Sequence, residues 1–439
     1  MIPARLPLLA RAAPDAPVAW RQGQAISRAT FLRHVSAVAR RLPPARFILN
    51  LCEDRYRFLV AFAAVGVNGQ TSLLPSNRAS LHLRQLAEDY PDNARIADDD
   101  LASWLGSDTA NQTLPAAPEL PADQVMAMAF TSGSTGRAKP NPKTWGELVS
   151  GAEQARQRFR FAPGMTLVAT VPPQHMYGLE TSIMAPLISG ISVHGGRPFF
   201  PDDVRAALDA VPAPRVLVTT PIHLQACVQA GLRWPKTRFL ISATAPLAPT
   251  LAAQAEALFA APVLEIYGCT EAGSIASRRT LDGERWRLYD GFQLRDGWLS
   301  GAHLPEPVAL NDVIQECSAD EFKLLGRRED LVNIAGKRTS LGYLNHQLND
   351  IEGVMEGVFI APAGAGTEVR RLLAVVVAPG LSERQVLAAL AQRLDPVFLP
   401  RPLVKVAALP RNDTGKVTRE ALLALVARLH PSATTPHES

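Results

Sequence analysis

Short apolar runs alternate with helix-like patterns through the middle of this 439-residue chain. The strand-like runs occupy 125–130, 167–171, 215–219, 238–242 and 262–266. Helical spacing of apolar residues marks the segments 28–42, 55–65, 202–210 and 250–259. Strands alternating with helices in this way predict an α/β fold in which a large N-terminal domain has doubly wound, mostly parallel sheets. Ligands of such sheets bind where the carboxyl ends of the strands meet.

Beyond about residue 275 the pattern changes to short strands punctuated by Gly and Trp, as in 285–299. A charged junction at 326–330 follows. After it we expect a hairpin, a helix near 340–350, a strand at 371–377 and a helix near 382–394. The chain is therefore predicted to divide into an N-terminal domain, 1–326, and a small α+β C-terminal domain, 327–439.

Composition excludes several classes of function. A net charge of +4 with 6% aromatic residues lacks the basic, aromatic platform of a nucleic-acid binder. The cysteines Cys52, Cys227, Cys269 and Cys317 are far apart, which argues against zinc and disulfides and suits a reducing cytoplasm. No apolar run reaches the ~18 residues of a membrane span. We therefore expect a cytoplasmic protein without a membrane span or a nucleic-acid partner.

Lysine is rare in this chain, because 38 of its 45 basic residues are arginine. A drift of codons towards GC-rich DNA explains most of the arginines, and it makes each retained lysine more informative. The seven are Lys139, Lys143, Lys236, Lys323, Lys337, Lys405 and Lys416.

The first motif directly follows the run 125–130. It comprises Thr131, Ser132, Gly133, Ser134, Thr135 and Gly136, with Lys139 three residues further on. Glycine turns, hydroxyls and one lysine form a concave set of donors that suits a polyphosphate. The spacing differs from that of a Walker A loop. Taken alone, the motif also fits a solvated turn rich in Ser and Thr.

Two further motifs follow. After the run 262–266 come Tyr267, Gly268, Cys269, Thr270 and Glu271, which offer a ring for a purine, a hydroxyl and a carboxylate for Mg²⁺. Near the C-terminus, Lys416 follows Gly415 in a turn. That lysine is either a mobile charge or an ordinary surface residue.

In this order and spacing, the three motifs resemble the adenylate-forming superfamily of acyl-CoA synthetases, peptide-synthetase adenylation domains and luciferases. The stretch 312–330 and the hairpin-like 331–341 extend the resemblance. It implies that a carboxylic acid reacts with ATP and Mg²⁺ to give acyl-AMP and pyrophosphate, and that the acyl group then passes to a phosphopantetheine thiol. It also implies that the C-terminal domain is a mobile lid that turns about a hinge near 326–330, between the two half-reactions.

The resemblance implies a role for each motif residue. Residues 131–139 would cradle the β- and γ-phosphates, Thr270 the α-phosphate and Glu271 the Mg²⁺. Tyr267 and Gly268 would enclose the adenine with Ala243, Thr244 and Ala245, and Asp312 would bind the ribose with Arg327. Lys416 would bridge the acid and the α-phosphate, Glu329 would be the hinge, and Gly336 would let pantetheine approach. Glu329 departs from the family's usual Asp or Lys, and the 271–312 region is shorter than in most members.

The predicted acid pocket comprises His175, Met176, Tyr177, Thr220 and His223, flanked by Pro221 and Leu224. Amino-acid-activating domains carry an Asp where this chain has His175 and Met176, so a buried ammonium would lack its counter-charge. Met, Tyr and His suit a flat, partly polar acid such as hydroxybenzoate. A short fatty acid stays open, and so does a plain structural role for His175.

The compact length resembles the short AMP-ligases of bacterial aryl-polyene and xanthomonadin pigment clusters, which implies an acyl carrier protein as thiol acceptor. Arginines of the small domain could meet such an acidic partner, although solvated surface charge explains them equally well: Arg370, Arg371, Arg393, Arg401 and Arg411. Two alternatives stay open. One is a fatty or aryl acyl-CoA synthetase using free coenzyme A, and the other is a non-catalytic nucleotide-binding regulator.

Overall fold

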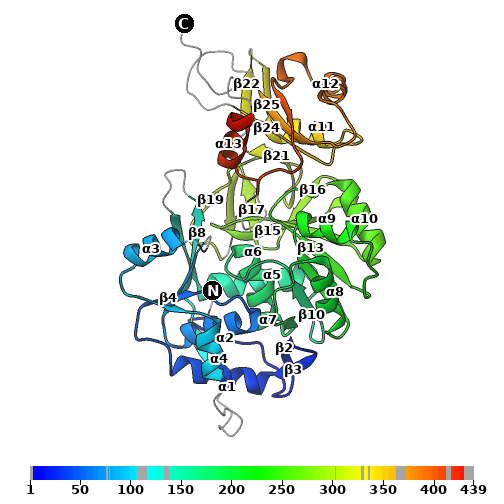
Figure 1. Ribbon diagram of the computed structural model, residues 1–439. Coiled ribbons are helices and arrows are strands. Elements are labelled where there is room, and N and C mark those ends of the chain that lie inside the picture. The colour runs from blue at the N-terminus through cyan, green and yellow to red at the C-terminus, as the bar shows by residue number, and fades with distance from the viewer. Residues whose placement is uncertain are drawn as a thin grey trace. The chain divides into compact units, whose positions relative to one another are not determined.

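The computed structural model in Figure 1 describes residues 3–75, 78, 80–105, 116–132, 138–301, 303–327, 331–334, 337–361, 372–411 and 417–429. The chain forms two compact units, Met1–Gln293 with Ser300–Val308, and Leu294–Leu299 with Ala309–Ser439. The three short strands β17 (Phe292–Arg295), β18 (Trp298–Gly301) and β19 (Val308–Ala309) lie where the chain passes between the units. The predicted domain boundary between 326 and 327 stays a prediction.

The larger sheet of the first unit has the strand order β16-β15-β14-β13-β12-β10-β11-β2-β3. Its middle strands, from β14 to β2, run parallel, and the strands at the two ends pair antiparallel. The strands are β2 (Pro17–Arg21), β3 (Gln24–Ser27), β10 (Thr166–Ala169), β11 (Ser192–His194), β12 (Arg215–Thr219), β13 (Phe239–Ser242), β14 (Val263–Cys269), β15 (Gly273–Arg279) and β16 (Arg285–Leu288). The predicted strands and their parallel arrangement are confirmed.

Helices connect these strands and bury their apolar stripes on the sheet. Leu208, Leu224 and Ala255, from three of the helices, pack in one core cluster with Leu217 and Leu240 of the strands. The helices are α5 (Trp145–Phe159), α6 (Met176–Leu179), η1 (Glu180–Met184), α7 (Ala185–Ser189), α8 (Pro201–Asp209), α9 (Pro221–Gln229), α10 (Pro249–Phe259) and η2 (Thr280–Asp282). The crossovers therefore follow the α/β rule that the sequence predicts.

A second sheet in the same unit has the order β6-β4-β5-β8-β9, parallel except for the last pair. Its elements are β4 (Phe47–Asn50), β5 (Thr71–Leu74), β6 (Asn93–Ile96), β8 (Val125–Ser132), β9 (Ala138–Thr144), α1 (Arg28–Ala39), α2 (Arg55–Val67), α3 (Ser80–Asp89) and α4 (Asp98–Leu105). The dark-blue to light-blue helices α1, α2 and α4 lie together in Figure 1. A small ladder joins β1 (Arg5–Pro7) to β7 (Glu119–Pro121).

Helix α2 is the apolar segment that comes nearest to a membrane span in composition, and it is a core helix. Every residue from Phe58 to Val65 is fully buried, and Asp54 caps the helix by accepting from the amide of Arg57. Among the described residues, no helix is long and apolar enough to cross a membrane.

The second unit is α+β, as predicted. Strand β20 (Asp312–Glu316) pairs with β21 (Glu321–Arg327), β22 (Leu331–Ile334) with β23 (Lys337–Ser340), and β24 (Glu356–Ile360), β25 (Leu373–Val377) and β26 (Leu403–Lys405) form a small sheet. Its helices are α11 (Leu341–Asn349), α12 (Glu383–Ala391), η4 (Pro396–Phe398) and α13 (Arg419–Leu429). Strand β25 sends Ala374 and Val376 into one core cluster and Val375 into another, as the two-residue period of a strand requires. The expected hairpin, helices and strand of this region are confirmed.

Candidate active site

The first motif lies at the end of the β8–β9 hairpin. Strand β8 continues two residues past the predicted run, and its register pairs Thr131 with Lys139. Lys139 is exposed. The predicted phosphate-binding residues Gly133, Ser134, Thr135 and Gly136 lie outside the described residues. The expectation that Thr131 and Ser132 follow the strand was wrong, because antiparallel pairing with β9 carries the ladder through both.

The second motif forms the end of the β14–β15 hairpin. Tyr267, Gly268 and Cys269 belong to β14, so the expectation that the strand ends at 266 was also wrong. Pairing continues because β15 folds back on β14, with Cys269 opposite Gly273 and an irregularity in register between Tyr267 and Gly268. The turn residues that follow Cys269 begin with Thr270 and Glu271, which therefore sit at the tip of a hairpin.

The two segments predicted to enclose the adenine lie at the carboxyl ends of two neighbouring parallel strands, β13 and β14. Ala243, Thr244 and Ala245 follow β13, which pairs with β14. Thr244 has a φ of 81°, a left-handed conformation that a β-branched residue rarely adopts and that is typical of functional sites. The Tyr267 ring packs against the ring of Trp286, with 5.7 Å between the ring centroids.

The predicted acid-pocket residues Tyr177, Thr220 and His223 converge on the carboxyl ends of three strands. The Tyr177 hydroxyl donates to the carbonyls of Thr219 and Ile241, each at 3.0 Å. His223 Nδ1 lies 3.0 Å from the Thr220 hydroxyl and 3.1 Å from the Thr170 hydroxyl. Burial, and then the nearby positive charge of Arg197, lower the pKa of His223 to about 4. At neutral pH His223 therefore carries no charge.

Met176 and His175 have different surroundings. His175 is half-buried at the start of α6 and makes no side-chain cap of that helix. Met176 lines a small cavity, together with Lys143, Glu180, Gly273 and His303. The structure therefore brings Tyr177, Thr220 and His223 together, while Met176 lines a cavity beside the turn of the β14–β15 hairpin.

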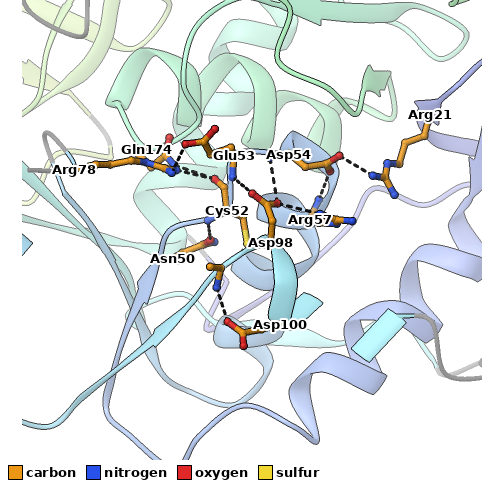
Figure 2. Close-up of polar contacts among 11 residues, drawn as sticks. Arg21, Asn50, Cys52, Glu53, Asp54, Arg57, Arg78, Asp98, Asp100 and Gln174 are labelled. Atoms are coloured by element: carbon orange, nitrogen blue, oxygen red, sulfur yellow. Dashed lines mark hydrogen bonds and ion pairs between the residues drawn. The ribbon is translucent and has the colours of Figure 1, made fainter. Parts of the chain in front are cut away.

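The stretch 174–177, which carries His175, Met176 and Tyr177, is tied to the loop after β4 of the second sheet, as Figure 2 shows. Gln174 donates to the carbonyl of Cys52 at 3.0 Å, and Arg78 donates to the same carbonyl at 3.2 Å. Asp98 accepts from the amides of Glu53 at 2.7 Å and Asp54 at 3.2 Å. The loop after β4 is thus fixed by charged side chains, and it fixes the residue before His175 in turn.

Arg55, the first residue of α2, binds the carboxyl end of β10 and the chain that follows it. The side chain is completely buried and donates to the carbonyls of Ala169 at 2.9 Å and Val171 at 2.7 Å, and to the hydroxyl of Ser182. Burial lowers its pKa to about 9. A buried guanidinium that satisfies three acceptors holds the carboxyl end of β10 against η1.

In the second unit, Asp312 and Arg327 are directly opposite each other in the β20–β21 register. The predicted ribose-binding pair is thus a cross-strand pair. Asp312 also lines a cavity of about 280 Å³ with Asp296 and Glu316. Lys416, the hinge residue Glu329 and the pantetheine-side Gly336 lie outside the described residues, so their roles stay predictions.

Sequence reasoning gave no role to Lys143, Glu180 or His303. These three side chains surround the β14–β15 turn, where Lys143 donates to the carbonyl of Glu271. They lie far apart in the sequence and carry no common motif. The scarcity of lysine was the one signal that pointed to Lys143.

A family model described as AMP-binding enzyme matches residues 35–295, which is more than half of the chain. The chain belongs to this family of AMP-binding enzymes. A 4-coumarate–CoA ligase from Halorhodospira halophila is 29% identical over 310 residues, spanning 65% of this chain and 73% of that relative. Among solved structures, ATP-bound MatB from Rhodopseudomonas palustris matches with a TM-score of 0.82 at 21% identity, covering 95% of this chain and 97% of that one.

O-succinylbenzoate coenzyme A synthetase (MenE) from Bacillus subtilis, in complex with AMP, gives a TM-score of 0.80 at 17% identity and covers 95% of this chain and 98% of that one. The predicted fold class and the membership of an AMP-binding family with CoA ligases among its relatives are confirmed. The closer likeness of this AMP-binding enzyme to the pigment-cluster ligases stays a prediction.

The free energy of unfolding of this AMP-binding enzyme is expected to decrease as the pH is lowered below about 6.5. Burial lowers the pKa of His223 and of His34 to about 4. Between about 4 and 6.5 the unfolded chain binds protons at both histidines and the folded chain does not, so each adds a slope of up to about 1.4 kcal/mol per pH unit. Urea unfolding at pH 7, 6 and 5 measures the slope. The variant His223→Gln should show a shallower slope than the wild type, and equal slopes would contradict the assignment.

Proposed function

We propose that this AMP-binding enzyme joins a carboxylic acid to a phosphopantetheine thiol in two steps, through acyl-AMP. The observation that carries the proposal is the position of Thr270 and Glu271, at the hairpin tip that follows β14. The neighbouring parallel strand, β13, is also followed by predicted site residues, Ala243 to Ala245. The family membership and the CoA ligases among the relatives support the same reaction.

In the first step, an oxygen of the acid carboxylate attacks the α-phosphorus of ATP. The bond from that phosphorus to the bridging oxygen breaks, and pyrophosphate leaves with the electron pair. Both reactants are anions, so the enzyme must position them and neutralise the charge that builds on the phosphate oxygens. Thr270 donates to the α-phosphate, Lys416 places its charge between the two anions, and the loop 131–139 holds the leaving phosphates.

Glu271 is the residue that we propose as the protein ligand of Mg²⁺. Its carboxylate sits at a partly exposed hairpin tip, and among the described residues no cluster of three or more His, Cys, Asp or Glu side chains could hold a metal. One carboxylate joined by substrate phosphates is a usual setting for Mg²⁺. When bound there, Mg²⁺ supplies charge stabilisation at the phosphate oxygens.

For the acid, we propose an aryl carboxylate with a polar substituent. The Tyr177 hydroxyl already serves two backbone carbonyls, and His223 is neutral. Glu180 is the acidic residue nearest along the chain to the pocket stretch, and its oxygens accept hydrogen bonds from Ser274. An ammonium group would thus lack a free counter-charge, whereas an uncharged ring is accommodated. The likeness to a 4-coumarate–CoA ligase supports this class of acid.

For the thiol, we propose free coenzyme A. The sequence favours an acyl carrier protein as acceptor, with free coenzyme A as the alternative. Of the second-unit arginines that could meet an acidic carrier protein, Arg393 pairs with Asp350 at 2.6 Å and Arg411 pairs with Glu356. Both pairs lower the positive charge left for an acidic partner. Arg401 is exposed, and Arg370 and Arg371 lie outside the described residues.

Acid-dependent exchange of pyrophosphate with ATP tests the first step directly. We expect exchange with hydroxybenzoates or hydroxycinnamates at least 10-fold faster than with amino acids, because one missing polar partner in a buried site costs that much or more. Exchange with fatty acids alone would keep adenylation and contradict the aryl pocket. No exchange with any acid would favour the non-catalytic nucleotide-binding alternative. Thioester formation with coenzyme A, compared with a phosphopantetheinylated carrier protein, then identifies the acceptor.

A further inference from the structure

The turn at the tip of the β14–β15 hairpin is held by side chains from three other parts of the first unit. Two of them bind the turn backbone, at Glu271 and at Ser274, and the third lines the same cavity as Ala272. None of the three comes from the hairpin itself, and none belongs to the motifs that identify the nucleotide site.

Lys143, on β9, binds the first of these positions. Its side chain is only 6% exposed, and its Nζ donates to the backbone carbonyl of Glu271. Burying an ammonium group is costly unless it is hydrogen-bonded. The contact therefore fixes the carbonyl of the residue whose side chain we propose as the magnesium ligand.

Glu180, the first residue of η1, binds the far side of the turn. Both of its carboxylate oxygens lie 3.1 Å from the amide of Ser274, and one accepts from the Ser274 hydroxyl at 2.6 Å. The approach is so close that a Cβ on Gly273 would lie 2.2 Å from this carboxylate. Burial raises the pKa of Glu180, while the Ser274 bonds and the charge of Lys143 act to lower it.

His303, which follows β18, lines the same cavity as Ala272, the turn residue between these two contacts. It is 8% exposed, and its Nδ1 has no hydrogen-bond partner among the described residues. His303, Lys143, Glu180 and Glu147 line a common cavity of about 20 Å³, enough for one water molecule. These four polar groups thus form one cluster beside the turn rather than separate contacts.

We propose that Lys143 is a positioning residue for adenylation, because it sets the place of the turn that carries Thr270 and Glu271. The inference rests on the proposed function. Displacing a reacting or charge-stabilising group by about 1 Å costs roughly 10²-fold in rate. The charged donor of Lys143 reaches this three-residue turn from a different sheet.

The test uses Lys143→Met, which keeps the length of the apolar stem and removes the charged donor, and Lys143→Arg, which restores a charged donor. We expect Lys143→Met to lower kcat for pyrophosphate exchange by about 10–100-fold, with the KM for ATP changed less than threefold. We expect Lys143→Arg to recover a substantial part of the loss. Amide hydrogen exchange of a peptide spanning 268–276 should be faster in Lys143→Met than in the wild type.

Lys405→Met is the matched control, since the Nζ of Lys405 also donates to a backbone carbonyl, that of Leu381, in the second unit. It should lower the melting temperature without a comparable loss of kcat. Equal losses of kcat in Lys143→Met and Lys405→Met, or an unchanged kcat in Lys143→Met, would overturn the proposal alone. A wild type that exchanges with no acid would overturn the proposed function and this inference together. If Lys143→Met does not fold, the same comparison is made with Lys143→Gln, which keeps an uncharged donor.

Discussion

Replacing Lys416 with alanine is expected to lower the rate of acid-dependent pyrophosphate exchange by about 10²–10³-fold, the usual effect of removing one charge-stabilising donor from a transition state. The two reacting groups are a carboxylate and a phosphate, and their repulsion is largest when the new bond forms. A lysine that contacts both contributes most at that point and little to binding of ATP alone. We therefore expect the dissociation constant of ATP to change less than threefold.

Exchange kinetics and calorimetric titration of ATP measure the two quantities separately. Lys236→Ala is the matched control, because Lys236 is exposed and its side chain has no role in the site. An exchange rate near that of the wild type in Lys416→Ala would exclude the assigned role. A large loss of ATP affinity would instead make Lys416 an ordinary phosphate ligand.

The parallel sheets could be predicted because buried strands have a strong local signal. The run 215–219 has an apolar centre, Val216 to Val218, lies between Pro214 and Pro221, and forms β12 over the same residues. Strand β14 was harder, because its last three residues, Tyr267 to Cys269, are not a continuation of the apolar run. What extends the strand is pairing with β15, and a partner strand is a tertiary feature that no local pattern contains.

The parts of the candidate site that lie close together in the sequence could be predicted. The parts that folding brings together from distant segments could not. Tyr267, Thr270 and Glu271 are close in sequence, and so their place together at the end of one hairpin could be anticipated. Lys143, Glu180 and His303 meet only because three elements pack around one turn. For the predicted acid pocket, the sequence offered Tyr177 and His223 by type, but could not indicate that their polar atoms contact Thr219, Ile241, Thr170 and Thr220.

Gly268→Ala is expected to lower the exchange rate by about 10²-fold and the free energy of unfolding by about 1–3 kcal/mol. A Cβ at this position would lie 2.2 Å from the carbonyl oxygen of Gly273 and 3.0 Å from the Cα of Ser274. Both are backbone atoms, so no rotation of a side chain relieves the clash. The two strands of the hairpin must separate, and the turn with Thr270 and Glu271 moves with them.

The matched control is Gly380→Ala, where a Cβ would meet nothing within 4 Å and the backbone is not in a left-handed conformation. Its exchange rate and unfolding free energy should equal those of the wild type. Urea unfolding and exchange kinetics on the same preparations separate a loss of folded protein from a loss of rate. If folded Gly268→Ala exchanges within threefold of the wild type, the position of this turn does not limit adenylation. Because Lys143 acts on the same turn, that result would also predict a small effect for Lys143→Met, so the two variants test one structural cause from opposite sides of the hairpin.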